Sequence, residues 1–310
     1  MPAPSASFPL ADRLTANVAR VLLGKKPAIQ LATIALLAEG HLLIEDNPGV
    51  GKTLLARALA KSLDLPFQRV QCTADLLPAD ILGGHVYQPA TGDVVFRPGP
   101  VFTSVLVADE LNRTPPRTQS ALLQCMQERK VTIDRTTHDL PDPFFVVATQ
   151  NPQTVSGTYP LPESQLDRFA LRIELGYLDP EHEALAVARA DGFRALEGLT
   201  CIASADDVRA ARQHVRGVRV DPSLVRYMVE LAQRTRAHSD VRVGVSTRGA
   251  QALHRTCQAR ALLFDRDYVS PDDVQTLAAP ALAHRLSGPP DASAAQAVIL
   301  EILAATPVPE

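Results

Sequence analysis

The stretch that decides the fold runs Leu42-Leu43-Ile44-Glu45-Asp46-Asn47-Pro48-Gly49-Val50-Gly51-Lys52-Thr53. Its first three residues form a short apolar run that is typical of a buried strand, and apolar residues recur at helical spacing over positions 54–63. The segment between them contains glycine and proline and predicts a tight loop at the start of a helix. Such a loop directs several backbone N–H groups into one concavity, which suits the phosphates of a nucleotide.

The loop follows the pattern Gly-x-x-x-x-Gly-Lys-Ser/Thr with one departure, because Asp46 stands where the first glycine is usual. We expect Lys52 to reach the outer phosphates and the Thr53 hydroxyl to hold Mg²⁺. The predicted nucleotide-binding residues are Asn47, Pro48, Gly49, Val50, Gly51, Lys52, Thr53 and Leu54. The alternative interpretation is an ordinary glycine turn before an amphipathic helix, which the strand–loop–helix context disfavours.

A second motif follows downstream, where an apolar run over residues 104–108 ends in Asp109 and Glu110. This pattern predicts a central parallel strand, whose carboxyl end is the functional end. We expect Asp109 to belong to the Mg²⁺ shell and Glu110 to polarise a water for attack on the γ-phosphate. An apolar strand that ends in two acids is common, so the upstream loop carries much of this interpretation.

Three further polar residues are candidates. Asn151 follows a third apolar run, residues 144–148, so it should lie near Glu110 and bind the attacking water or the phosphate; alternatively it caps the turn before Pro152. Arg168 follows a short predicted helix, where an arginine is usually a surface or ion-paired residue. Arg248 falls in the first turn of the helix that begins after Ser246, where a cation is unfavourable unless a phosphate lies nearby.

Composition narrows the class of protein. The 310 residues allow one large domain, or one large and one small, and the net charge of −3 gives no electrostatic footprint for nucleic acid. The four cysteines are far apart in sequence, which disfavours a zinc site or disulfide framework and fits a reducing compartment. Residues 1–9 lack the features of a signal peptide, and no apolar stretch is long enough to cross a bilayer. We therefore expect a cytoplasmic protein without membrane insertion.

The pattern along the chain changes near residue 176. Before it, strand-like runs alternate with helices, and two hairpins are predicted near residues 84–98 and 131–140. After it, only helices recur. Their start signals are Asp179, Ser204, Asp221, Ser246 and Ser270. We predict an α/β nucleotide-binding core with a parallel sheet over residues 1–175 and an all-helical domain over residues 176–310.

Taken together, the ordered segments resemble the MoxR group of AAA+ ATPases over nearly the whole length. The core segments that carry the resemblance are Pro-Gly-Val-Gly-Lys-Thr at 48–53, Gly-Pro-Val-Phe at 99–102, Ala-Asp-Glu-Leu-Asn-Arg at 108–113, Pro-Pro-Arg-Thr-Gln-Ser-Ala-Leu-Leu at 115–123, Met-Gln-Glu at 126–128, Ala-Thr-Gln-Asn-Pro at 148–152, Gly-Thr-Tyr-Pro-Leu-Pro-Glu at 157–163 and Gln-Leu-Asp-Arg-Phe at 165–169. In the helical part they are Thr-Arg-Ala-His at 235–238 and Ser-Thr-Arg at 246–248.

The resemblance implies an AAA+ P-loop NTPase core with inserted β-hairpins and a small helical lid, which hydrolyses ATP with Mg²⁺. It further implies Asn151 as the sensor-1 residue, Arg248 as the sensor-2 residue closing from the lid, and Arg168 as an arginine finger that acts on the neighbouring subunit's nucleotide. A ring, commonly a hexamer, follows from that last role. The family tolerates Asp46 at the first glycine position, and the hairpins would point toward the pore or the client.

By the same resemblance, the function is a chaperone or remodeller of partner protein complexes, often working with a von Willebrand factor A domain protein. Metal-chelatase and rubisco-activating motor subunits share this machinery, and the core does not separate them. A nucleic-acid motor needs basic hairpins, whereas the first hairpin carries one Asp and one Arg and the second carries two Asp and one Arg. A small-molecule kinase is disfavoured by the acid pair, by Asn151 and by the separate helical lid.

Overall fold

The computed structural model describes residues 10–152, 157–188 and 192–309, so the chain start that lacked signal-peptide features lies outside the described residues. Its centre is a five-stranded parallel sheet with the order β2-β5-β8-β1-β9. The strands are β1 (Leu42–Glu45), β2 (Phe67–Gln71), β5 (Val105–Asp109), β8 (Phe145–Gln150) and β9 (Leu171–Ile173). The predicted parallel α/β core is confirmed.

Alternating residues of the strands divide the core between the two faces of the sheet. Leu42 and Ile44 of β1 belong to the larger apolar cluster, with α1 (Leu10–Ala19), α2 (Lys26–Leu37) and α3 (Lys52–Ser62). Leu43 belongs to a second cluster on the other face, with α4 (Pro78–Leu82) and α5 (Pro116–Glu128). Strands buried on both faces explain the near-continuous apolar runs in the sequence.

The sequence Thr114-Pro115 predicts a helix with Thr114 as N-cap and Pro115 as its first residue, but α5 begins one residue later. Pro115 is the N-cap and Pro116 the first helical residue. The carbonyl of Pro115 accepts the N–H groups of Thr118 and Gln119, and Thr114 is fully buried. The expected Thr–Pro helix start was therefore wrong by one position, since a second proline already fills the first turn.

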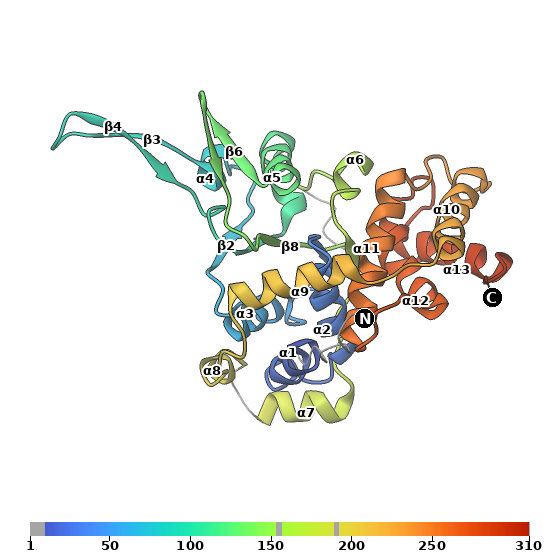
Figure 1. Cartoon of the computed structure of the whole chain (residues 1–310). Coiled ribbons are helices and arrows are strands. Elements are labelled where there is room, and N and C mark those ends of the chain that lie inside the picture. The colour runs from blue at the N-terminus through green and yellow to red at the C-terminus, as the bar shows by residue number, and fades with distance from the viewer. Residues whose placement is uncertain (1–9, 153–156, 189–191, 310) are drawn as a thin grey trace.

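Both predicted hairpins are present, and they contact each other. They are β3 (Gly83–Gln88) with β4 (Asp93–Pro98), and β6 (Lys130–Ile133) with β7 (Thr136–Asp139). The rings of Phe96 and His138 stack at 4.3 Å between centroids, and His85 lies 2.9 Å from the Asp134 carboxylate. Figure 1 shows the two hairpins extending from the core on the side away from the last helices of the chain.

The short helix α6 (Glu163–Leu166) precedes β9 and lies within the predicted core. After β9 the described chain is helical, as expected, with the 3₁₀ turn η2 (Ala283–Arg285) and the helices α7 (Pro180–Ala188), α8 (Gly192–Glu197), α9 (Ala205–Gly217), α10 (Pro222–Ala237), α11 (Thr247–Leu263), α12 (Pro271–Leu282) and α13 (Ala292–Ala305). The predicted N-caps Ser204, Asp221 and Ser246 each accept a backbone N–H of the first turn. Helix α8 contacts α3 and α9 contacts α2, so the domain boundary near residue 176 stays a prediction. Among the described residues, no helix has the length and apolarity needed to cross a membrane.

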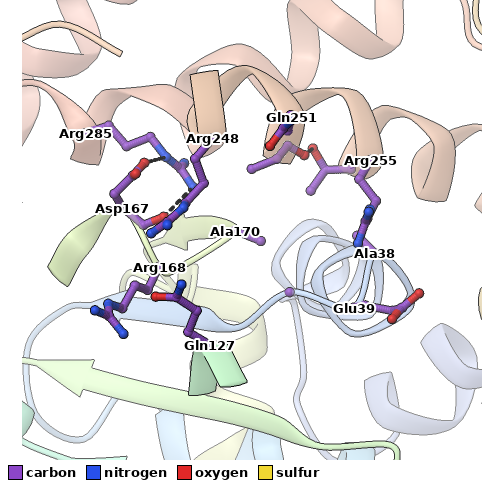
Figure 2. Close-up of a pocket in the computed structure, with 13 residues that line it drawn as sticks. Ala38, Glu39, Gln127, Asp167, Arg168, Ala170, Arg248, Gln251, Arg255 and Arg285 are labelled. Carbon is purple, nitrogen blue, oxygen red and sulfur yellow. Dashed lines mark hydrogen bonds and ion pairs between the residues drawn. The ribbon is translucent and has the colours of Figure 1, made fainter. Parts of the chain in front are cut away.

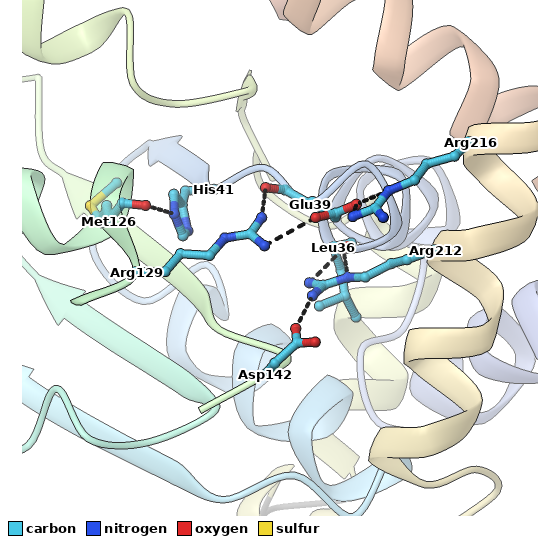
Figure 3. A network of polar contacts seen from close by, with 8 residues as sticks. All are labelled: Leu36, Glu39, His41, Met126, Arg129, Asp142, Arg212 and Arg216. Atoms are coloured by element: carbon cyan, nitrogen blue, oxygen red, sulfur yellow. Dashed lines mark hydrogen bonds and ion pairs between the residues drawn. The ribbon is translucent and has the colours of Figure 1, made fainter. Parts of the chain in front are cut away.

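Helix α9 is linked by polar contacts to the residues just before and just after the β6–β7 hairpin (Figure 3). The Glu39 side chain, 5% exposed, lies between Arg216 of α9, at 2.8 Å, and Arg129, at 3.0 Å. Arg129 immediately precedes β6. Arg212 of α9 donates to the carbonyl of Leu36 at 3.0 Å and to the carboxylate of Asp142, beyond β7, also at 3.0 Å. The helix therefore braces the hairpin at its entry and at its exit.

His41, at the entry to β1, should make the protein less stable in acid. Its Nδ1 accepts the N–H of Val146 and its Nε2 contacts the carbonyl of Met126, each at 3.0 Å, so the neutral ring fits both partners. Burial lowers the pKa of His41 from 6.5 to about 4. The unfolded chain then binds the extra proton between these pH values, so stability is complete above pH 6.5 and falls toward pH 4 by about 3 kcal/mol.

Urea unfolding between pH 7.5 and 4.5 measures this loss, with the His41→Asn variant as the comparison. His284 is buried too and its pKa is also lowered by burial, so the variant should keep part of the slope. An unfolding free energy that stays constant from pH 7 to pH 5 would contradict a neutral buried His41.

Candidate functional site

The loop after β1 has the left-handed backbone that only glycine adopts without strain. Gly49 has φ +84° and Gly51, the N-cap of α3, has φ +98°. A Cβ on Gly51 would come within 2.9 Å of Leu22, so close packing adds a second reason for glycine there. Lys52 opens α3 and donates from Nζ to the carbonyls of Asp46 at 2.5 Å and Gln150 at 3.3 Å. Burial lowers the pKa of Lys52 against the opposing attraction of nearby carboxylates.

Asp46, the departure from the usual glycine, has a structural role that the sequence does not reveal. Its carboxylate is buried and accepts three backbone N–H groups. These belong to Asn47 at 2.7 Å, Leu175 at 2.6 Å and Gly176 at 2.7 Å. Asp46 therefore joins the first residue of the loop to the segment that leads from the sheet into the helical half.

Replacing Asp46 by alanine should destabilise the fold by about 2 to 4 kcal/mol, because buried N–H groups lose their charged acceptor. Asp46→Asn keeps one acceptor oxygen and should lose less. Denaturant unfolding of both variants gives the values, with the exposed Asp93→Ala as the matched control. Equal stability of Asp46→Ala and Asp93→Ala would refute this role.

The acid pair lies at the end of β5, next to β8. Asp109, 9% exposed, accepts the Thr149 hydroxyl at 2.6 Å and the Arg69 guanidinium at 2.6 Å. Thr149 in turn accepts the N–H of Glu110 at 2.9 Å. The Asp109 carboxylate and the Glu110 backbone are therefore fixed by hydrogen bonds to the neighbouring strands β2 and β8.

Glu110 adopts a left-handed conformation, with φ +57°, that costs energy for a residue with a side chain. Its carboxylate pairs with Arg113 at 2.7 Å. Strain of this kind persists where surrounding contacts enforce it, and it is common at functional sites.

The carboxyl edge of the sheet brings the other predicted residues together. Strand β8 lies between β1 and β5, with Gln150 paired to Glu45. Asn151 follows directly, so it sits between the loop after β1 and the acids after β5. Thr53 and Leu54, in the first turn of α3, are half-buried beside the loop. Hydroxyl and carboxylate oxygens of Thr53 and Asp109 are the ligand type that Mg²⁺ prefers, so these residues fit the ion.

Arg168 and Arg248 lie elsewhere, at the amino edge of the sheet. They line a cavity of about 220 Å³ together with Gly40, which precedes β1, and Ala170, which precedes β9. Figure 2 shows Arg248 descending from α11 toward Asp167 and Arg168. The expectation that Arg248 closes over the loop of its own chain thus differs from its position, because α11 packs against the opposite edge.

The Arg168 segment is held by the helical half. The neighbouring Asp167 accepts Nε of buried Arg285 at 2.8 Å and the Ser246 hydroxyl at 3.0 Å. Arg168 itself donates to the carbonyl of Leu123 at 2.6 Å, while its Nε is buried without a partner among the described residues. Within those residues, Arg248 makes no hydrogen bond or ion pair. Two arginines with unused donors face one small cavity.

Three residues of the acid cluster were not predicted from the sequence: Arg69, Arg113 and Thr149. Thr149 was within reach, since it lies near the carboxyl end of β8, next to the carboxyl end of β5 where Asp109 lies. Arg69 could be found only from the pairing of β2 with β5, which places Gln71 opposite Asp109.

Comparisons with known proteins agree with this geometry. A family model described as ATPase family associated with various cellular activities (AAA) matches residues 41–171, and an AAA lid domain model matches residues 233–302. The uncharacterized protein YeaC of Bacillus subtilis is 46% identical over 97% of this chain and 95% of its own. Chaperone MoxR1 of Mycobacterium tuberculosis is 37% identical over 89% of this chain and 75% of its own.

Protein MoxR of Paracoccus denitrificans is 32% identical over 86% of this chain and 85% of its own. The fold is also found in a crystal structure from Cytophaga hutchinsonii, of a protein provisionally described as an ATPase. That structure is 38% identical, covers 98% of this chain and 96% of its own, and superposes with a TM-score of 0.89. The family implies nucleotide binding and suggests assembly of several subunits. The chain belongs to the MoxR family of AAA+ ATPases.

Proposed function

We propose that the protein hydrolyses ATP to ADP and phosphate in a site shared by two adjacent subunits of a ring. The observation that carries this proposal is the separation of the site residues. At the carboxyl edge of the sheet lie the predicted phosphate-binding loop, Asp109, Glu110 and Asn151. At the amino edge, Arg168 and Arg248 face a cavity. Neither half is complete, and a head-to-tail contact between copies would join them.

Each residue then has a distinct role. The loop amides and Lys52 bind the phosphates, and Thr53 with Asp109 would hold Mg²⁺, which offsets negative charge on the phosphates. Glu110 polarises the attacking water and Asn151 orients it. Arg168 and Arg248 of the next subunit stabilise the charge that develops in the transition state.

The test is phosphate release per subunit, measured against protein concentration. Turnover should rise with concentration and reach a plateau where light scattering reports a ring, for which we propose six subunits. Constant turnover per subunit down to the monomer range would contradict a shared site.

We further propose that the ring is a chaperone or remodeller of protein complexes. The exposed Val86, Tyr87 and Val94 give the β3–β4 hairpin an apolar surface, which suits a protein client better than a phosphate backbone. The family resemblance implies a von Willebrand factor A domain protein as partner, and metal-chelatase or rubisco-activating roles remain alternatives. Affinity capture with Glu110→Gln and ATP would identify the client.

The free cysteines fit a cytoplasmic location.

A further inference from the structure

Helix α7 is exposed along its described length. None of its residues is buried, although its second half is the apolar run Ala184-Leu185-Ala186-Val187-Ala188. Leu185 is 51% exposed and Val187 is 74% exposed. A surface helix normally turns its apolar stripe to the core. Leu185 and Val187 are two positions apart and lie on different sides of the helix, so both sides expose apolar area that another chain can cover.

The position of α7 is fixed on the nucleotide side of the subunit. The preceding residues Leu175 and Gly176 bind Asp46 of the loop, and the carbonyl of Tyr177 accepts Nζ of Lys25 at 2.6 Å. His182 of α7 packs so closely on Gly24 that a Cβ there would lie 3.0 Å from its ring. In Figure 1, α7 lies below α1, on the far side of the molecule from α10.

The helical half carries a groove between α10 and α11 of about 590 Å³. Its apolar lining includes Val225, 37% exposed, and Val229, 44% exposed. Its polar lining includes Arg255, Arg216, which already pairs with Glu39, and His254, whose pKa is lowered by burial. Arg255 also lines the cavity of Arg168 and Arg248, so the groove lies next to that cavity.

The two surfaces match in chemistry. The first turn of α7 is acidic, with Asp179 before it and Glu181 and Glu183 within it, and the rest is apolar. The groove offers exposed valines beside basic side chains. Charge complementarity of this kind orients a contact, while apolar burial supplies most of its stability.

We propose that α7 of one subunit docks into the α10–α11 groove of the next copy of this chain. The proposal rests on the shared ATP site. A contact that brings Arg168 and Arg248 to a neighbour's loop would place the adjacent groove near the neighbour's α7, because the segment that leads into α7 is hydrogen-bonded to that loop. The interface is head-to-tail, so it propagates around a ring.

Cysteine cross-linking tests the contact in the full chain. Exposed Cys201 is first replaced by serine, which leaves three buried thiols. The experiment is done with ATP in the Glu110→Gln background. On oxidation, a chain that carries both Val187→Cys and Val229→Cys should form a ladder of disulfide-linked oligomers that ends at the size of the ring. Mixed chains that each carry one of these cysteines should give dimers only. The matched control carries Val187→Cys with Leu300→Cys, also exposed, in place of Val229→Cys, and it should give no ladder.

Val187→Asp adds an independent measurement. The residue is exposed in the subunit, so the fold should be unaffected, whereas the concentration for half-maximal assembly should rise about tenfold or more. Leu300→Asp should leave that concentration unchanged.

The outcomes separate the two proposals. Suppose that turnover of the ring requires Arg168, but that no ladder forms and Val187→Asp does not weaken assembly. This result would overturn the α7 contact and leave the shared site intact. Cross-linking of Val187→Cys chains to one another would replace the head-to-tail contact by a symmetric one. Turnover that is independent of assembly overturns both proposals.

Discussion

Replacing Arg168 by alanine is expected to lower ATP turnover of the assembled protein by at least about 10³-fold, the range found for arginine fingers. ATP binding should change little, because the loop that binds the phosphates lies at the other edge of the sheet. The Arg168 guanidinium makes one hydrogen bond, to the Leu123 carbonyl, and its Nε has no partner among the described residues. Its removal therefore costs the fold little.

Steady-state phosphate release and nucleotide titration measure the two quantities separately. Arg168→Lys should recover little activity, since an ammonium lacks the planar donor fork of a guanidinium. Arg226→Ala, on the exposed side of α10, should be active. An Arg168→Ala ring that hydrolyses ATP at more than a tenth of the normal rate would remove Arg168 from the site.

The second large effect is expected from Glu110→Gln, which should lower turnover by about 10² to 10⁴-fold, the usual contribution of a general base. The amide has the same shape as the carboxylate, and the backbone bond from Glu110 to Thr149 does not involve the side chain. The left-handed turn and the Asp109 contacts should therefore persist. The variant should bind ATP, keep it and remain assembled.

Single-turnover measurements separate binding from hydrolysis in this variant. Glu128→Gln, at the exposed end of α5, is the matched control and should retain normal turnover. Turnover of Glu110→Gln within a few-fold of normal would mean that another group activates the water.

The sequence predicted the parallel core and the loop–acid–Asn151 arrangement because these follow from local patterns and one topological rule. Apolar runs define the strands, and in a parallel sheet polar residues that follow neighbouring strands must meet at one edge. The residue types at that edge then indicate the chemistry. The assigned roles of Glu110 and Asn151 stay predictions until activity is measured.

The position of Arg248 could not be predicted in the same way. Ser246 indicates where α11 begins, but it says nothing about which edge of the sheet the helix meets. That depends on long-range contacts such as Arg285 with Asp167 and Ser246 with Asp167. The resemblance implied that Arg248 closes from the lid, and it did not anticipate a cavity that Arg248 shares with Arg168.

The hairpins and Asp46 show the same limit. Turn residues predicted both hairpins, whereas the stack of Phe96 on His138 joins segments from different parts of the chain and has no local signal. Asp46 looked like a tolerated exception to a motif. Its partners Leu175 and Gly176 lie about 130 positions away, so only the fold reveals its role as an anchor.

The central claim is that one ATP site draws its residues from two subunits, and mixing two inactive variants tests it most directly. Arg168→Ala subunits keep the loop and Glu110, while Glu110→Gln subunits keep Arg168. In rings assembled from an equal mixture, about one site in four should contain both intact halves, so phosphate release should return well above that of either variant alone. A mixture that forms rings but stays as inactive as its two components would contradict the shared site.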